Sequence, residues 1–321
     1  MQHILDITTI ILTYNEEIHI RRCLENVCPF SKKVYVVDSP STDLTVEICQ
    51  KFPNVEVVVH KYPGNQAEQF NWAIDNLTIE TDWILRVDAD EYCEPELILE
   101  MEEKLPKLPK EVTAIVTPIG REFMGRRLRH GIVKGVSLTR ILRPGKVRYE
   151  TSLMDEYMKV LEGKSVKFEH AIVDANRISL SAFTDKHNNY SSREAAMLLD
   201  AEFELRELTS IDLATNGNLA KEVLAKRAMK KKYAKMPLFW RSMGYFVYRY
   251  IVKLGFLDGK EGFCWDFFQG LWYRALVDGK VFQARKWMKD EGLQVNGDGT
   301  LSKESKDALK KYINDKWKVS L

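Results

Sequence analysis

The sequence is poor in cysteine and has no cysteine pattern typical of a disulfide framework or a zinc site. Its five cysteines are an odd number, and no two of them form a Cys-x-x-Cys pair. Cysteine use of this kind fits a protein kept in a reducing compartment.

Long apolar runs and a strong net charge are also missing. No uncharged run reaches the roughly 18 residues that a membrane-spanning helix needs. The N-terminus lacks the basic region and apolar core of a signal peptide. The formal net charge is only +2, so nothing in the overall charge indicates a nucleic-acid partner. We therefore expect a cytoplasmic protein that does not bind nucleic acid.

What is present is the composition of a folded globular chain, with 45% hydrophobic and 29% charged residues. Apolar runs typical of strands alternate with helical patterns through the first ninety residues. We expect strands at 7–12, 34–37, 55–59 and 83–87, and helices at 18–27, 44–51 and 65–76. This alternation predicts an α/β fold, with a mostly parallel, Rossmann-like sheet and helices on both faces.

Beyond residue 91 the pattern is mixed. A helix is expected at 94–105, strands at 112–117, 137–142, 146–149 and 166–170, and a helical region from residue 181 onward. We expect a catalytic domain over residues 1–195 and a helical extension, rich in aromatic and basic residues, over 196–321.

The stretch from Trp83 to Glu91 reads as a buried strand that ends in three carboxylates. Folding does not require such an ending, because Asp is a poor strand former and like charges repel. Asp88 and Asp90 are two residues apart, so in an extended chain they share a face. Two carboxylates with open positions beside them suit Mg²⁺ or Mn²⁺ carrying a diphosphate. The alternative is a solvated acidic turn.

Polar clusters follow three of the expected strands, after Leu12, Val37 and Val87. Parallel strands end at one edge of a sheet, and ligands bind beyond that edge. Three polar strand ends at one edge are stronger evidence for a ligand site than any one of them alone.

These clusters carry a resemblance to a known family. The relevant stretches are Ile11-Leu12-Thr13-Tyr14-Asn15-Glu16-Glu17, Val36-Val37-Asp38-Ser39-Pro40-Ser41-Thr42-Asp43 and Asp88-Ala89-Asp90-Glu91. Together they resemble the family 2 inverting glycosyltransferases of the GT-A fold. Within that family the chain is similar to the lipopolysaccharide-core glucosyltransferase branch, which has patterns like Arg140-Ile141-Leu142-Arg143 and Lys186-His187-Asn188-Asn189-Tyr190. The resemblance covers about residues 7 to 195.

The resemblance implies a nucleotide-sugar donor, with a UDP-sugar expected. Asp38 matches the residue that contacts the uracil edge in the family, although it could instead cap the turn that follows it. The nucleotide-binding residues implied are Thr13, Tyr14, Asn15, Glu17, Asp38, Asn71, Arg86 and Asp88. Arg86 could equally pair with a nearby carboxylate.

The resemblance also implies a divalent cation, Mn²⁺ or Mg²⁺, on the diphosphate. Asp90 and Asp88 match the metal-binding motif of the family, and His170 matches a histidine that can complete the site. His170 could also be an ordinary core or surface histidine.

Inversion requires a base that takes a proton from the acceptor hydroxyl. The Asp155-Glu156 pair lies where the family carries its acidic pair. The order Asp-Glu departs from both Glu-Asp and His-Glu, the pairs common there, so either residue could be the base. A charged loop pair is the plain alternative.

For the acceptor we expect a glycan or glycolipid, such as lipopolysaccharide core, capsule or a lipid-linked oligosaccharide. Arg140, Lys186 and Tyr190 are the residues that we expect to hold acceptor or phosphate groups. The aromatic and basic extension fits either contact with a membrane surface, on the cytoplasmic face of the inner membrane, or a packed helical core. The expected function is a metal-dependent inverting hexosyltransferase. The alternatives are a protein or peptide glycosyltransferase of the same fold, and a non-catalytic scaffold that binds sugar nucleotides.

Overall fold

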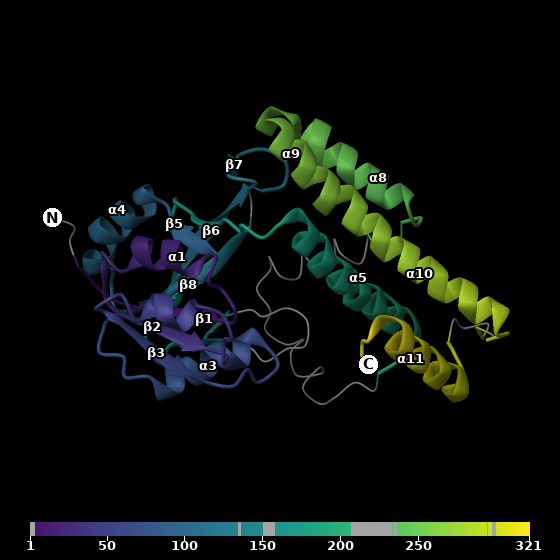
Figure 1. Cartoon of the computed structure of the whole chain (residues 1–321), viewed down its shortest axis with the longest axis horizontal. Coiled ribbons are helices and arrows are strands. Elements are labelled where there is room, and N and C mark those ends of the chain that lie inside the picture. The colour runs from purple at the N-terminus through teal and green to yellow at the C-terminus, as the bar shows by residue number, and fades with distance from the viewer. Residues whose placement is uncertain are drawn as a thin grey trace. The chain divides into compact units, whose positions relative to one another are not determined.

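The structure is a computed structural model that describes residues 4–133, 136–149, 158–206, 233, 236–293, 295–296 and 300–321. The chain divides into two compact units, residues 1–177 and 178–321 (Figure 1). The domain boundary expected after residue 195 falls inside one continuous helix, α5 (Leu180–Phe203).

A sheet of ten strands among the described residues forms the centre of the first unit. Eight strands follow the order β3-β2-β1-β4-β8-β6-β12-β5, and β7 and β11 both pair with β6. The ten strands are β1 (Leu5–Thr13), β2 (Ser31–Asp38), β3 (Val55–Val59), β4 (Trp83–Arg86), β5 (Glu91–Cys93), β6 (Val112–Phe123), β7 (Arg126–Leu128), β8 (Ser137–Leu142), β11 (Lys164–Lys167) and β12 (Ile172–Asp174). A separate antiparallel pair is formed by β9 (Val147–Tyr149) and β10 (Met158–Val160).

Strands β3, β2, β1 and β4 are parallel neighbours. Their carboxyl ends therefore lie at one edge, as the alternating pattern predicts. β8 then runs antiparallel to β4, which makes the sheet mixed from that point on.

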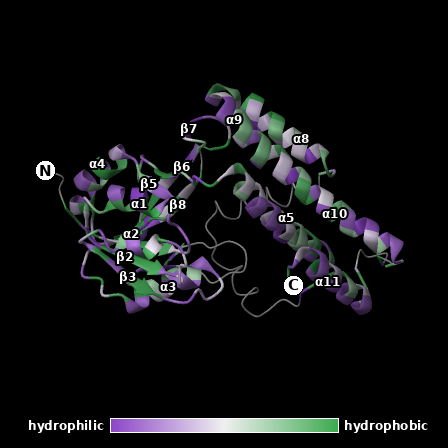
Figure 2. Ribbon diagram, viewed as in Figure 1, coloured by the Kyte–Doolittle hydropathy of each residue, from purple (hydrophilic) through white to green (hydrophobic). Residues whose placement is uncertain are grey.

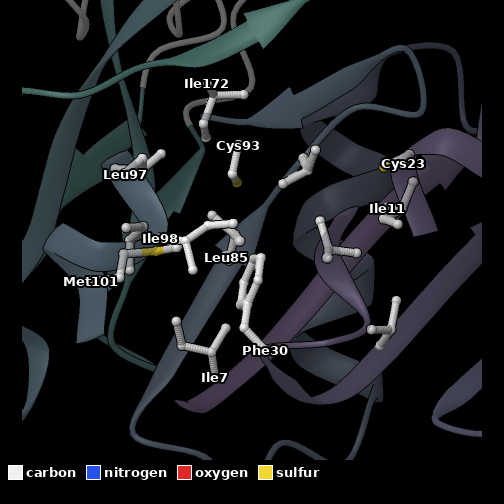
Figure 3. Close-up of a cluster of buried hydrophobic side chains, with 14 of the residues drawn as sticks. Ile7, Ile11, Cys23, Phe30, Leu85, Cys93, Leu97, Ile98, Met101 and Ile172 are labelled. Atoms are coloured by element: carbon white, nitrogen blue, oxygen red, sulfur yellow. The ribbon is translucent and has the colours of Figure 1, made fainter. Parts of the chain in front are cut away.

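Four helices and a short 3₁₀ turn pack against this sheet: α1 (Ile20–Val27), α2 (Thr45–Cys49), α3 (Gln66–Asn76), α4 (Pro95–Lys104) and η1 (Leu105–Lys107). Successive residues of a strand point to opposite faces. Ile11 packs in one core with residues of α1 and α4 (Figure 3), and residues of α2 belong to the same core. Ile10 packs in a second core with Phe70 of α3. Helices therefore cover both faces, and the predicted fold class is confirmed.

The last strands of the first unit differ from the expectation. The strand expected at 166–170 is β11, which ends at Lys167, so His170 is not at the end of a strand. A further strand, β12, follows and pairs with both β6 and β5. Its three residues are too few to show a period in the sequence.

The second unit is helical, as expected for the extension. Its elements are α5, α8 (Trp240–Val247), two π-helical stretches η2 (Tyr248–Val252) and η4 (Asp266–Trp272), the 3₁₀ turn η3 (Gly255–Asp258), α9 (Gly259–Trp265), α10 (Tyr273–Asp290) and α11 (Lys303–Trp317). Leu199, Val277 and Leu309 share a core that joins α5, α10 and α11. Among the described residues, no helix combines the length and apolarity needed to cross a bilayer.

Candidate functional site

The ends of β1 and β2 are joined by a buried aspartate. Thr13 and Asp38 are register partners at the last positions of these two parallel strands. The Thr13 hydroxyl donates to Asp38 Oδ1 at 2.9 Å. Ser41 donates its hydroxyl to the same oxygen at 2.6 Å and its backbone N–H to Oδ2 at 2.8 Å. Asp38 therefore caps the turn after β2, which is the alternative role that the sequence allowed for it.

The loop after β1 is bonded to the loop after β2. Asn15 has a left-handed backbone with φ of 54°, which Asn tolerates better than most residues. Its Oδ1 accepts from the N–H of Thr42 at 2.8 Å. Glu17 Oε2 accepts from the N–H of Leu44 at 3.1 Å. Tyr14, by contrast, is 62% exposed, so its ring is available to a ligand.

An acid cluster with two buried arginines follows β4. Arg86 Nε lies 3.3 Å from Asp88 Oδ1, and Arg140 Nη2 lies 3.4 Å from Asp88 Oδ2. Arg140 also donates to Glu91 Oε1 at 2.5 Å. The other Glu91 oxygen accepts from the N–H of Asp88 at 2.9 Å. Arg140 was predicted to face acceptor or phosphate groups. It is 4% exposed, and its guanidinium contacts these two carboxylates.

The same contacts set the charge of the cluster. Burial alone would raise the pKa of Asp88, but Arg86 and Arg140 outweigh it and lower that pKa to about 2. Burial raises the pKa of Glu91 to about 8. The charge of Asp88 raises it further, whereas Arg140 opposes the rise. Asp88 is therefore the firmly ionised member of the pair at neutral pH.

Asp90 is held from the end of β12. Its Oδ2 accepts from Asn176 Nδ2 at 2.8 Å. Asp174 is the register partner of Glu91 in the antiparallel β5–β12 pair and forms an ion pair with Arg121. Burial raises the pKa of Asp174 despite Arg121, and the charge of Asp90 adds to the effect. A second carboxylate thus lies close enough to Asp90 to repel it.

A histidine fixes the segment that carries Asn176. The backbone N–H of Arg177 donates to His19 Nε2 at 2.9 Å. Because Nε2 accepts, the ring proton is on Nδ1, which lies 2.6 Å from Glu16 Oε2. His19 is 2% exposed, so this link joins the start of α1 to the end of β12 inside the protein.

The carboxylates of Asp88 and Asp90 suit a cation that takes only some of its ligands from the protein. Within the described ranges, no three His, Cys, Asp or Glu side chains form a metal-binding group. Asp174 Oδ1, however, is buried without a hydrogen-bond partner. Arg121 pairs with the other oxygen of Asp174, and Arg22 lies near Asp90, so what Asp174 Oδ1 lacks is a hydrogen-bond or metal partner of its own. Asp90 and Asp88 are the residues that would hold the metal, and phosphate oxygens would complete its shell.

Four other predicted residues, Asn71, His170, Lys186 and Tyr190, contact residues other than the carboxylates that follow β4. Asn71 bonds both ends of its amide to the backbone of Tyr149, at 3.0 Å each, and so positions β9. His170 precedes β12, and its backbone N–H donates to Glu100 of α4 at 3.1 Å. The structure brings Asn176, from the other end of β12, to Asp90. Lys186 and Tyr190 belong to α5 in the second unit, where the Lys186 ammonium lies 5.9 Å from the Tyr190 ring.

Asp155 and Glu156 lie outside the described residues. The segment that carries them joins Tyr149 to Met158, which are register partners in the β9–β10 pair. Arg86 lies over the Tyr149 ring at 4.7 Å. The two described residues that flank this segment are therefore neighbours, and one of them, Tyr149, lies beside Arg86.

Sequence reasoning missed Asp174, Asn176 and His19. Asp174 had a signal, because Ile172-Val173-Asp174 repeats the pattern of Val36-Val37-Asp38, two β-branched residues followed by Asp. His19 and Arg177 are 158 residues apart, so no local sequence pattern indicates their contact.

Comparison with known proteins supports the reading of this unit. Residues 8–160 match the family model Glycosyl transferase family 2. The SPbeta prophage-derived glycosyltransferase SunS of Bacillus subtilis is 27% identical over 195 residues, which are 59% of this chain and 40% of SunS. An uncharacterized glycosyltransferase of Rickettsia bellii is 36% identical over 96 residues, 30% of this chain and 31% of that protein. The chain therefore spans less than half the length of these relatives.

Two solved structures are similar at low levels. Staphylococcus aureus TarS 1–349 is 14% identical with a TM-score of 0.40, over 91% of this chain and 94% of that one. Glucosyl-3-phosphoglycerate synthase from Mycobacterium tuberculosis, in complex with Mn²⁺ and UDP-glucose, is 17% identical with a TM-score of 0.30, over 35% of this chain and 43% of that one. Likeness this weak carries no argument about substrate.

Proposed function

Because residues 8–160 match the Glycosyl transferase family 2 model, we propose that this chain transfers a sugar from a nucleotide donor, with inversion, to a glycan acceptor. The observation that carries the proposal is the acid cluster of Asp88, Asp90 and Asp174. Asp88 and Asp90 follow β4, and Asp174 is the last residue of β12, in the same unit as the joined loops after β1 and β2. Ligands of open α/β sheets bind beyond such strand ends.

In this proposal the loops after β1 and β2 form the nucleoside side of a UDP-sugar site. Tyr14 offers an exposed aromatic face against which a base can stack. Asp38, Asn15 and Glu17 hold the two loops in the conformation that receives the nucleotide. Their bonds to backbone N–H groups of the loop after β2 support this role. We also propose that Thr13, Asp38 and Asn71 contact the nucleotide directly.

We assign the diphosphate side to Asp90 and Asp88. A bound Mn²⁺ or Mg²⁺ would neutralise the diphosphate as it leaves. Arg86 and Arg140 keep Asp88 ionised, and Asn176 orients Asp90 through its Oδ2. The proposed metal role of His170 has less support, because its bonded neighbour is Glu100.

Asp155 or Glu156 is the proposed base. It takes the proton of the acceptor hydroxyl while that oxygen bonds to the anomeric carbon and the bond from that carbon to the diphosphate breaks. The position of Tyr149 beside Arg86, directly before that segment, supports a base there.

For the acceptor we propose a bacterial surface glycan, such as lipopolysaccharide core, capsule or a lipid-linked oligosaccharide, and a reaction in the cytoplasm. Lys186 and Tyr190, both exposed on α5, are the proposed acceptor contacts of the second unit. This part of the proposal rests on sequence resemblance.

The test is a thermal-shift screen of UDP-sugars with Mn²⁺ and with EDTA, followed by UDP release from the sugar that binds. A ligand of the folded state raises its melting temperature. We expect a shift and UDP release with Mn²⁺, and loss of both with EDTA or in Asp90→Asn. Asp82→Asn, at a carboxylate 72% exposed, is the matched control and should behave as the parent. A chain that binds but never releases UDP would indicate a non-catalytic scaffold, and no shift with any nucleotide sugar would overturn the proposal.

A further inference from the structure

The helical stretch formed by α8 and η2 has its charges inside and its apolar side chains outside. The buried residues of α8 are Arg241 and Ser242, and the buried residue of η2 is Arg249. The exposed large side chains are apolar or aromatic, namely Trp240, Met243, Val247, Tyr248, Ile251 and Val252. A helix facing water normally shows the opposite pattern.

The buried charges are fully paired within the second unit. Arg241 binds Asp278 at 2.5 and 2.8 Å, and Ser242 donates to the other Asp278 oxygen at 2.7 Å. Arg249 binds Asp266 of η4 at 2.8 Å. Burying ion pairs is costly and seldom gains stability over an apolar core. The arrangement therefore makes sense if the outer side of the helix meets an apolar medium.

The exposed side chains form one continuous stripe. Trp240, Met243, Val247 and Ile251 follow steps of three and four residues, which places them on one side of a helix. Trp240 is 78% exposed and Val252 61%. Leu254, Phe256 and Leu257 extend the exposed set through η3. We call the residues between 240 and 257 that have exposed apolar side chains the outer apolar face. In Figure 2, α8 is mostly green or pale, the colours of hydrophobic and intermediate residues.

The charge around the outer apolar face is positive. From Met236 to Lys260 the acidic residue is Asp258, which is buried, and Glu261 of α9, which follows, is half-buried. Lys253 and Lys260 are exposed, and the Lys253 ammonium lies 5.4 Å from the Tyr248 ring. In the sequence, residues 221–235 just before this stretch carry seven Lys or Arg against one Glu.

We infer that the outer apolar face docks on an anionic lipid surface. Trp, Tyr and Lys beside an apolar stripe are the groups that settle at the boundary between headgroups and acyl chains. The thirteen residues of α8 and η2 span about 20 Å, less than the roughly 30 Å of a bilayer core, so they would lie in the plane of the interface. This inference goes beyond the proposed sugar transfer and does not depend on it.

A second copy of the chain is a poorer occupant of this face. In a symmetric dimer the same patch meets itself. Lys253 and Lys260 would then face lysines, and the acidic side chains of residues 236–261 that could pair with them are the buried Asp258 and the half-buried Glu261. Lipid phosphates supply the missing negative charge.

The experiment is flotation of the full chain with vesicles of phosphatidylcholine alone and of phosphatidylcholine mixed with phosphatidylglycerol. We expect the parent to float with the anionic vesicles and less with the neutral ones. Trp240→Ser with Ile251→Ser should weaken binding at least about tenfold, because two apolar side chains no longer leave water. Lys253→Gln should weaken it about fivefold on anionic vesicles only.

The control is Val59→Ser with Leu99→Ser, which removes two apolar side chains of 62% and 63% exposure from the first unit. This variant should float like the parent. Circular dichroism checks that each variant is folded, and UDP release checks the first unit separately. Failure of the parent to float with either vesicle would overturn the inference. The inference would also be overturned if the parent formed a lipid-free dimer that dissociates in the Trp240→Ser, Ile251→Ser variant. The outer apolar face would then bind a second copy of the chain.

Discussion

Arg140 and Glu91 form a 2.5 Å ion pair in which both side chains are at most 5% exposed. The same guanidinium lies 3.4 Å from Asp88. Arg140 therefore contacts two carboxylates, of which Asp88 also pairs with Arg86 and is the one that we assign to the metal. Removing a single partner of a buried pair leaves a charge without compensation.

We predict that Arg140→Met lowers the free energy of unfolding by about 3–5 kcal/mol. The matched control is Arg148→Met, which breaks an exposed pair with Asp75 and should cost at most about 1 kcal/mol. Urea denaturation followed by circular dichroism measures both. Equal losses in the two variants would contradict the view that burial makes the Arg140 pair costly to break.

The parallel part of the fold could be predicted because each of its elements is long enough to show a period. The runs at 7–12 and 34–37 became β1 and β2 with their ends at one edge, and the tip residues Thr13 and Asp38 meet as expected. Local pattern and topology together thus predicted the edge where the candidate site forms.

The rest depended on contacts between distant parts of the chain. Asp174 and Asn176 reach Asp90 only because β12 inserts between β6 and β5, a pairing that no local pattern indicates. The burial of Arg140 was missed for the same reason: its counter-charges lie 49 and 52 residues away in sequence. In the extension, composition indicated aromatics and charges but not which of them would be buried.

A second prediction concerns Asp174, whose Oδ1 is buried without a hydrogen-bond partner near Asp90. Asp174→Asn removes a negative charge and keeps the size of the side chain. We expect Mn²⁺ affinity in the presence of UDP to fall about 10- to 100-fold, the usual effect of altering groups around metal ligands. Isothermal titration measures this.

The control for Asp174→Asn is again Asp82→Asn, which lies on the surface and should leave Mn²⁺ affinity unchanged. If Asp174→Asn binds Mn²⁺ as the parent does and only loses stability, Asp174 serves its ion pair with Arg121 and has no part in the metal site.

A third prediction separates the two candidate bases. Replacing the true base by its amide should lower transfer about 10²- to 10⁴-fold while leaving the affinity for the UDP-sugar unchanged. Asp155→Asn and Glu156→Gln are measured side by side, with transfer or UDP release for rate and a thermal shift for donor binding. One variant should be slow and the other close to the parent. Two variants that are both fully active would refute a base in this pair.

The last prediction uses two glycines of the second unit with opposite surroundings. A Cβ added at Gly255 would lie 1.9 Å from Asp266 Oδ2, so Gly255→Ala must displace the carboxylate that pairs with Arg249. A Cβ at Gly244 in α8 would meet nothing within 4 Å. We expect Gly255→Ala to cost about 1–3 kcal/mol through overpacking. Gly244→Ala should instead gain about 0.5–1 kcal/mol, because alanine favours the helix. Urea denaturation followed by the helical circular dichroism signal measures both, and a neutral Gly255→Ala would mean that the Arg249–Asp266 pair can shift at no cost.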